Sequence, residues 1–150
     1  MKRPPLRVEL LDWESARACA VPIRHTVFVV EQNVPEDSEI DDWDPQCVHA
    51  LALDATGTAV GTGRLLPDGH IGRMAVLKAA RHVGVGSALL TALMEEARRR
   101  GHLRAVLSAQ THAIPFYRRH GYAVVGGEYM DCGIAHVDMA CALGPPPKQC

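Results

Sequence analysis

A glycine-containing turn that joins an apolar strand to an amphipathic helix is the feature that most constrains this fold. Residues 74–77 form a short apolar run at the end of an expected strand over 70–76, and apolar side chains then recur at helical spacing after Gly84: Val85, Ala88, Leu89, Ala92, Leu93 and Ala97. Gly101 follows three arginines, an ending typical of a helix C-terminus. The pattern therefore predicts a strand, a tight turn and a helix over residues 70–100.

The turn itself has the composition of an anion-binding site. Backbone N–H groups at the start of a helix are unpaired and point at one spot, which suits a phosphate. Gly84 and Gly86 lack side chains, so a phosphate can approach the main chain, and Arg81 adds a positive charge. The alternative is a helix start whose glycines only permit a turn. The segment has neither the Gly-Lys-Ser/Thr ending nor the full Gly-x-Gly-x-x-Gly of two known phosphate loops.

Length, charge and cysteine usage limit the class of protein. The 150 residues suit one domain, and a net charge of -1 argues against duplex nucleic acid as the main partner. No apolar run approaches the roughly 20 residues of a membrane span, and no signal-peptide segment is recognisable. The cysteines form no Cys-x-x-Cys pair and the histidines no His-x-x-x-His pair, so no metal site is expected. We expect a cytoplasmic protein with reduced thiols.

The rest of the chain alternates between strand and helix patterns. Pro22 is expected to open a helix that runs through Arg24 and Phe28, since proline suits a first helical turn. Strands are expected at 6–11, 47–54, 58–66, 70–76, 103–109, 122–125 and 136–143, and further helices at 84–100 and 114–120. The sequence predicts a single α/β domain over residues 1–150 with a mixed sheet, a core of about 6–143 and a loose tail at 144–150.

A second motif carries a resemblance to a known family. Residues 108–122 read Ser-Ala-Gln-Thr-His-Ala-Ile-Pro-Phe-Tyr-Arg-Arg-His-Gly-Tyr. Together with the turn at 81–86, this segment resembles the GCN5-related N-acetyltransferases, the GNAT family. There, an Arg/Gln-x-x-Gly-x-Gly/Ala turn holds the pyrophosphate of acetyl-CoA, and a later Asn-x-x-Ala-x-x-Phe-Tyr segment lines the pantetheine arm. Gln110 stands where asparagine is usual, and His82 where glycine is common.

The resemblance implies a fold and a set of cofactor contacts. The fold would be a mixed, mostly antiparallel central sheet flanked by helices, with splayed central strands that form the acetyl-CoA cleft. The implied cofactor-binding residues are Met74, Ala75, Val76, Arg81, His82, Val83, Gly84, Val85, Gly86, Ser87, Gln110, Phe116 and Tyr117. The segments at 24–35 and 133–139, with Glu39, Asp41 and His49, are similar to the small bacterial branch often labelled YjcF- or ElaA-like.

The implied reaction is attack by a neutral amine on a thioester carbonyl through a tetrahedral intermediate. An alkylammonium is only about 1 part in 10³ neutral at pH 7, so a base must help. In the related glyphosate-type acetyltransferases, a histidine at the place of His136 is the proposed base; water-linked carboxylates such as Glu31 or Glu39 are the alternatives. Tyr117 would protonate the departing thiolate, and N–H groups at Met74–Val76 would stabilise the oxyanion.

Each of these side chains also has a plainer interpretation. Tyr117 could be a packing residue, and His136 could be hydrogen-bonded to the main chain. Arg24 and Arg73 are expected to hold a carboxylate or phosphonate of the acceptor, because an arginine fork fits such groups; alternatively they are solvated or paired with the acidic run at 36–44. We interpret that run as a solvated loop, which would favour a cationic amine if it borders the acceptor cleft.

The leading hypothesis is an acetyl-CoA-dependent N-acetyltransferase that acts on the primary amine of a small molecule. An acyl-homoserine-lactone synthase and a non-catalytic acetyl-CoA-binding sensor are the two alternatives. The expected co-substrate is acetyl-CoA, and the expected partner is a small-molecule amine, with no metal, nucleic acid or membrane. A homodimer is kept as a further expectation. The residue types do not identify the acceptor.

Overall fold

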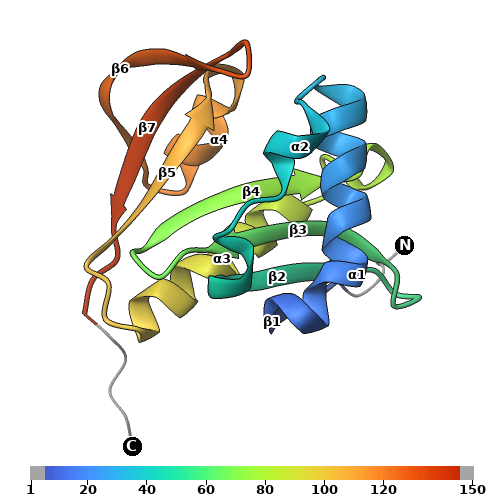
Figure 1. Ribbon diagram of the computed structural model, residues 1–150. Helices are drawn as coiled ribbons and strands as arrows, with labels where there is room; N and C mark the ends of the chain where they lie inside the picture. Colours follow the sequence, from blue (N-terminus) through green and yellow to red (C-terminus); the bar gives the residue numbers. More distant parts are fainter. Residues whose placement is uncertain (1–5, 146–150) are drawn as a thin grey trace, which may run out of the picture.

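A seven-stranded sheet in the order β1-β2-β3-β4-β5-β7-β6 organises residues 6–145, the part of the chain that the computed structural model describes (Figure 1). The strands are β1 (Arg7–Leu11), β2 (Val48–Leu53), β3 (Ala59–Leu65), β4 (His70–Val76), β5 (Arg104–Gln110), β6 (Ala123–Asp131) and β7 (Ile134–Ala142). All neighbours pair antiparallel except β4 and β5, which are parallel. The mixed, mostly antiparallel α/β fold predicted above is confirmed.

Helices cover both faces of the sheet (Figure 1). The helical elements are α1 (Trp13–Arg24), η1 (His25–Glu31), α2 (Glu36–Glu39), η2 (Asp44–Gln46), η3 (Lys78–Ala80), α3 (Val85–Arg99), η4 (Thr111–Ala113) and α4 (Ile114–Arg119). On β2 the side chains alternate: Ala50 and Ala52 pack with α3, whereas Leu51 and Leu53 pack with α1. This period of two places one helix on each face. None of the helices within residues 6–145 has the length and apolarity that a membrane crossing requires.

The main core lies between α3 and the sheet. Leu89, Leu90 and Leu93 are fully buried there, together with small residues of β2 and β5. Gly61 and Gly63 on β3 let α3 approach closely, since a Cβ at either position would meet a helix side chain at 3.0 Å or less. The predicted helix after Gly84 is therefore held by an apolar face of leucine, valine and alanine.

The sheet divides between β4 and β5. Their parallel pairing covers only His70↔Val106 and Ile71↔Leu107, and beyond this point the two strands separate (Figure 1). A bulge in β4 accompanies the division: the register with β3 shifts between Thr62 and Arg64, and Arg73 has φ = 49°. We call β1–β4 with α1 and α3 the body, and β5, β6 and β7 the wing. The predicted splaying of the central strands is observed.

The first helix was misjudged from the sequence. It begins at Trp13, with Asp12 as its N-cap accepting a hydrogen bond from the Ser15 N–H at 2.9 Å. Pro22 lies inside this helix, and the chain then continues as a seven-residue π-helix, η1. The prediction that Pro22 opens a helix is therefore wrong, because the capping signal lies ten residues earlier. Of the predicted loose tail, residues 146–150 lie outside the described residues.

Candidate active site between β4 and β5

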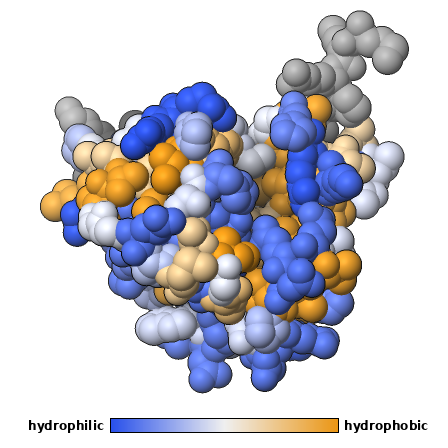
Figure 2. Space-filling model, turned by 90° about the horizontal axis from the view of Figure 1, so that it is seen from above, coloured by the Kyte–Doolittle hydropathy of each residue, from blue (hydrophilic) through white to orange (hydrophobic). Residues whose placement is uncertain are grey.

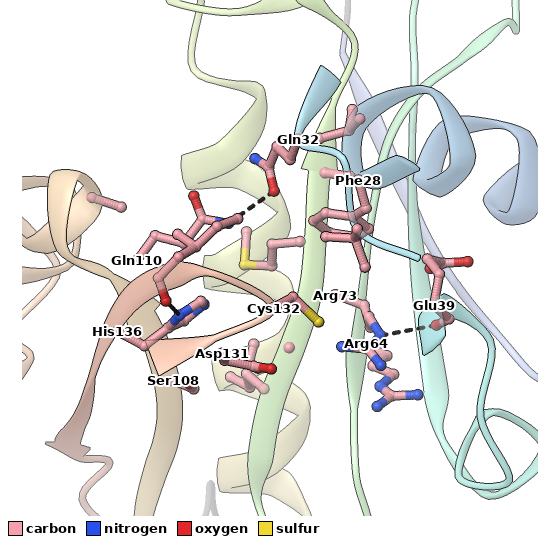
Figure 3. A pocket seen from close by; sticks show the side chains of 18 of the residues that line it. Phe28, Gln32, Glu39, Arg64, Arg73, Ser108, Gln110, Asp131, Cys132 and His136 are labelled. Carbon is pink, nitrogen blue, oxygen red and sulfur yellow. Dashed lines mark hydrogen bonds between the residues drawn. The ribbon is translucent and has the colours of Figure 1, made fainter. Parts of the chain in front are cut away.

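A cavity of about 880 Å³ occupies the gap between body and wing (Figure 3). It brings together predicted site residues from both motifs and from a late strand: Arg73, Met74, Ala75, Val76, Arg81, Gln110, Tyr117 and His136. Seen from above, the surface of the molecule shows hydrophobic and hydrophilic residues mixed together (Figure 2). A cavity lined by both kinds of residue suits a ligand with polar groups and an apolar stem.

The glycine turn has the geometry that an anion-binding helix start requires. Gly84 is the N-cap of α3 with φ = 89°, and no side chain caps this end of the helix. The first backbone N–H groups of α3 have no partner within the helix. A Cβ on Gly86 would lie 3.4 Å from Cζ of Phe116, so α4 packs directly against the turn. Ser87 Oγ is 3.0 Å from Nε2 of His120, a second link to α4.

Arg81 is tied to the end of η1. Its Nε–H donates to the Val76 carbonyl at 2.8 Å, and its Nη2 donates to both carboxylate oxygens of Glu31. The next residue, Gln32, accepts a hydrogen bond at 2.9 Å from the side-chain amide of Gln110 on β5 (Figure 3). The end of η1 therefore spans the gap from the turn to the wing. Glu31 is bound in an ion pair, which weighs against the alternative in which it is the base.

Tyr117 reaches the cavity from α4 through a cluster of aromatic rings. Its ring makes edge contacts with Phe116 and Tyr122, at centroid distances of 5.1 and 5.9 Å. Burial raises the pKa of Tyr117 to about 12. Its hydroxyl is therefore protonated at neutral pH, although the raised pKa makes it a weaker proton donor than an ordinary tyrosine.

His136 lines the cavity from β7 of the wing. Its Nδ1–H donates to the carbonyl of Ile134 at 2.7 Å, because a carbonyl oxygen can only accept. In the neutral ring this fixes Nε2 as the atom with a free lone pair. The ring stacks on Tyr129 at 6.0 Å and 21° between planes, so its orientation is held from two sides. His136 is thus both bonded to the main chain and exposed to the cavity.

The two arginines predicted to bind the acceptor have different surroundings. Arg24 is 1% exposed, and its guanidinium donates to Glu39 and Asp44. This is the alternative in which it pairs with the acidic run, and its side chain is not available to an acceptor. Arg73 lines the cavity instead, although it also donates to the Glu39 carbonyl at 3.1 Å (Figure 3).

The acidic run is built into the structure rather than solvated. Glu39 and Asp44 are buried, and two arginines, Arg24 and Arg64, bridge them to Asp41. We call these five residues the ion network. Hydrogen bonds from Arg64 lower the pKa of Asp41 to about 2. The interpretation of 36–44 as a solvated loop is wrong for these carboxylates, and Glu39 is likewise occupied by an ion pair.

The edge of β4 supplies backbone groups to the same cavity. Ala75 and Val76 pair with Thr62 and Gly61 of β3 on one side, whereas β5 has already separated on the other. Polar backbone groups that a neighbouring strand would otherwise use therefore face the gap. Such groups are the donors that a developing oxyanion needs.

Comparison with known proteins agrees with this arrangement. The model of the family described as "Acetyltransferase (GNAT) domain" matches residues 26–143. A Bacillus subtilis protein described as an uncharacterized N-acetyltransferase, YjcF, is 41% identical over 121 residues, covering 78% of this chain and 86% of the relative. The chain belongs to the GNAT acetyltransferase family.

Two solved GNAT-like structures show how far the likeness extends. An acyl-CoA N-acyltransferase from Pseudomonas aeruginosa superposes with a TM-score of 0.82 at 29% identity, over 92% of this chain and all of the other. Escherichia coli ElaA gives 0.82 at 28% identity, over 91% and 99%. The resemblance to this branch of the GNAT family, stated above from the motifs, is therefore confirmed for the fold and the family.

Several cavity residues of this GNAT domain were not found by sequence reasoning. They include Phe28 from η1, Gln32 directly after it, Ser108 from β5, and Asp131 and Cys132 at the β6–β7 turn (Figure 3). Ser108 has a signal in the sequence, because it stands two positions before Gln110 on one strand and so shares its face. Asp131 and Cys132 have none, since β6 was expected to end at residue 125. Within residues 6–145, no group of three or more His, Cys, Asp or Glu side chains is arranged to hold a metal ion.

Proposed function

We propose that this GNAT acyltransferase moves the acetyl group of acetyl-CoA to the primary amine of a small molecule by direct attack. The observation that carries the proposal is the position of His136 and Tyr117 on the same cavity as β4 and Arg81, the first residue of the turn. The first supplies a free imidazole lone pair, and the second a protonated hydroxyl. A base and an acid that face one space are what an acyl transfer to an amine needs.

The cofactor residues divide into three groups in this proposal. The N–H groups at the start of α3, around Gly84 and Gly86, hold the pyrophosphate, and Arg81 adds charge. The β4 edge at Met74–Val76 and the amide of Gln110 border the pantetheine arm. The remaining contacts come from the rest of the turn and from α4: His82, Val83, Val85, Ser87 and Phe116.

The chemical steps then follow from the positions of the side chains. The amine lone pair attacks the thioester carbon, and the carbonyl electrons move to the oxygen, which the β4 N–H groups stabilise. Nε2 of His136 takes a proton from the amine. An oxyanion lone pair then re-forms the C=O bond while the C–S bond breaks with its electrons on sulfur, and Tyr117 gives the thiolate a proton. Since a thiolate leaves tolerably well unaided, Tyr117 contributes less than the base does.

The acceptor half of the cavity carries both signs of charge. Arg73 contributes a guanidinium whose pKa is lowered by burial and by the charge of Arg64, so an anion bound beside it would stabilise its charged form. Asp131 contributes a carboxylate from the β6–β7 turn (Figure 3). These charges support an acceptor amine that also carries a carboxylate or phosphonate. A cytoplasmic location and a homodimer remain predictions.

The test is release of free thiol from acetyl-CoA over a panel of amino acids, polyamines, aminoglycosides and aminophosphonates. At least one amine should release thiol stoichiometrically with its acetylated product. Tyr117→Phe should lower kcat by roughly 10 to 10³-fold and leave the acetyl-CoA dissociation constant unchanged. Binding of acetyl-CoA without turnover for any amine would instead identify a non-catalytic binding module.

The cofactor site has its own test in Gly86→Val. The added γ-carbons would push against Phe116, which already lies 3.4 Å from a Cβ at this position. We expect acetyl-CoA affinity to fall by at least about tenfold, or about 1.4 kcal/mol. Gly127→Val is the matched control, because a Cβ there meets nothing within 4 Å. Equal affinity in wild type and Gly86→Val would reject the turn as the pyrophosphate site.

A further inference from the structure

Three side chains on the cavity face of the wing form a hydrogen-bonded chain that the proposed steps do not use. Ser108 of β5, Tyr129 of β6 and Asp138 of β7 lie on adjacent strands; Ser108 is directly opposite Asp138, and Tyr129 is opposite His136. Ser108 Oγ contacts the Tyr129 hydroxyl, which lies 2.7 Å from Oδ1 of Asp138. We call these three residues the wing chain.

The direction of the hydrogen bonds in the wing chain is fixed by its members. An ionised carboxylate only accepts, so Tyr129 donates its single proton to Asp138. Partial burial and the bond to Asp138 raise the pKa of Tyr129, so the phenol keeps that proton. With its proton committed, the Tyr129 oxygen can only accept from Ser108. Ser108 therefore donates away from the cavity and keeps its lone pairs for a ligand.

The free lone pairs of Ser108 lie beside the base. Ser108 and His136 both line the cavity, and on paired strands they are diagonal neighbours on one face. Such neighbours are roughly 7–8 Å apart at the backbone. One tetrahedral nitrogen with two hydrogen bonds of about 3 Å each joins acceptors that are about 5 Å apart, so side chains that lean toward each other from this backbone spacing can share it. Two acceptors, Nε2 of His136 and Oγ of Ser108, thus face the same volume.

We infer that Ser108 is a second amine-binding residue of this site, and that it makes the site selective for primary over secondary amines. The inference rests on the proposed function. When a primary amine attacks, its nitrogen carries two N–H bonds and a positive charge. His136 removes one of these protons, and Ser108 accepts a hydrogen bond from the other without taking it. Ser108 exchanges no proton in the net reaction, so the balance of the acyl transfer is unchanged.

A secondary amine cannot use both acceptors. After attack its nitrogen carries one N–H bond, and His136 needs that proton. The Ser108 lone pairs then face a methyl or methylene group. Losing a hydrogen bond to a charged group lowers a rate by roughly tenfold or more. The wing chain strengthens this difference, because Asp138 polarises Tyr129, and Tyr129 polarises Ser108. Tyr129 and Asp138 are positioning residues; Ser108 touches the amine.

The experiment compares each primary amine with its N-methyl derivative: glycine with sarcosine, benzylamine with N-methylbenzylamine, and aminomethylphosphonate with its N-methyl form. Thiol release from acetyl-CoA gives kcat/KM for each member. Wild type should favour the primary amine, and Ser108→Ala should reduce that ratio by about tenfold. Tyr129→Phe keeps the ring on His136 but removes the hydroxyl, and should shift the ratio in the same direction. Ser38→Ala removes another cavity-lining serine hydroxyl and should leave the ratio unchanged.

The double variant Ser108→Ala/Tyr129→Phe tests whether Tyr129 acts through Ser108 or the two residues act independently. Because Tyr129 acts through Ser108, the double variant should have the ratio of Ser108→Ala alone. A primary-to-secondary ratio that is the same in wild type and Ser108→Ala would overturn the inference while leaving the proposed function standing. Additive shifts in the double variant would overturn the chain. Absence of thiol release with every primary amine would instead reject the proposed function, and the inference with it.

Discussion

The two walls of the cavity carry polar clusters that differ in burial. On the body, the ion network holds Arg24, Glu39 and Asp44 almost without exposure. On the wing, the wing chain is exposed, with Tyr129 at 39%. Each cluster is hydrogen-bonded within itself, but the first is mostly enclosed by the fold whereas the second is exposed. Burial, rather than residue type, separates the cluster that holds the fold from the one that faces a ligand.

The contrast between Arg24 and Arg73 teaches the same lesson at the level of single residues. Both are arginines near the acidic run, and both contact Glu39. Arg24 uses its guanidinium on buried carboxylates, where an unpaired charge would be costly. Arg73 is about one third exposed and makes longer contacts, at 3.1 and 3.3 Å. Arg73 and Arg81 are each paired with a carboxylate but remain about one third exposed, whereas the buried Arg24 is out of a ligand's reach.

The comparison is tested most severely by Arg24→Met. Removing one partner of a buried ion pair leaves the other charge unpaired, so we expect a loss of about 3–5 kcal/mol in the free energy of unfolding. Urea denaturation measures it. Arg17→Met on the same helix is the control, because Arg17 is exposed and its contact with Glu14 is 3.9 Å long. Similar losses for both variants would mean that burial does not distinguish them.

Lowering the pH is expected to have an intermediate effect on the free energy of unfolding, because Asp41 becomes protonated. Its folded-state pKa of about 2 is below the ordinary 3.8, so its ionised form stabilises the fold above about pH 4. This contribution is lost as the pH falls from about 4 towards 2. In wild type, the free energy of unfolding should decrease over this window by more than in Asp41→Asn, which has no such proton to bind. If the free energy of unfolding fell equally with pH in both proteins, ionised Asp41 would not contribute to stability.

The smallest effect on stability is expected from Asp138→Asn on the wing. An exposed substitution away from the core changes the free energy of unfolding by about 0.5 kcal/mol or less. The same urea titration applies, and the variant keeps a hydrogen-bond acceptor for Tyr129. A loss approaching that of Arg24→Met would show that the wing chain, too, is a structural cluster. The distinction between the two walls would then fail.

The strand-turn-helix segment and the second motif were predictable because their signals are local. Glycine at Gly84 is needed for a φ of 89°, and the leucines of α3 repeat at the helical period. The α1 start was also readable, since Asp12 followed three residues later by Ser15 is a capping arrangement. The prediction placed the start of the helix at Pro22 instead, because proline is favoured in a first helical turn.

The parts that escaped prediction depend on residues far apart in the chain. Arg24 and Asp44 are 20 positions apart, and Ser108 and Tyr129 are 21 apart, so neither contact leaves a local pattern. The prediction ended β6 at residue 125, because Gly126 and Gly127 interrupt the alternation of polar and apolar residues. The observed register shift between Val125 and Tyr129 lies at these two glycines. Tyr129 itself follows this bulge, where the period of two no longer tells which face a side chain takes.

The short ladder between β4 and β5 has a consequence for how this protein can change. Two residue pairs join β4 of the body to β5 of the wing in the sheet, and α3 also packs against β5 in the main core. Substitutions on the two sides that share no partner are expected to add in free energy. Exchanges at Ser108 or Asp131 would then alter which acceptor is used without drawing on the stability that Arg24 and Arg64 provide. Acceptor preference and the free energy of unfolding are therefore expected to depend on different residues of this fold.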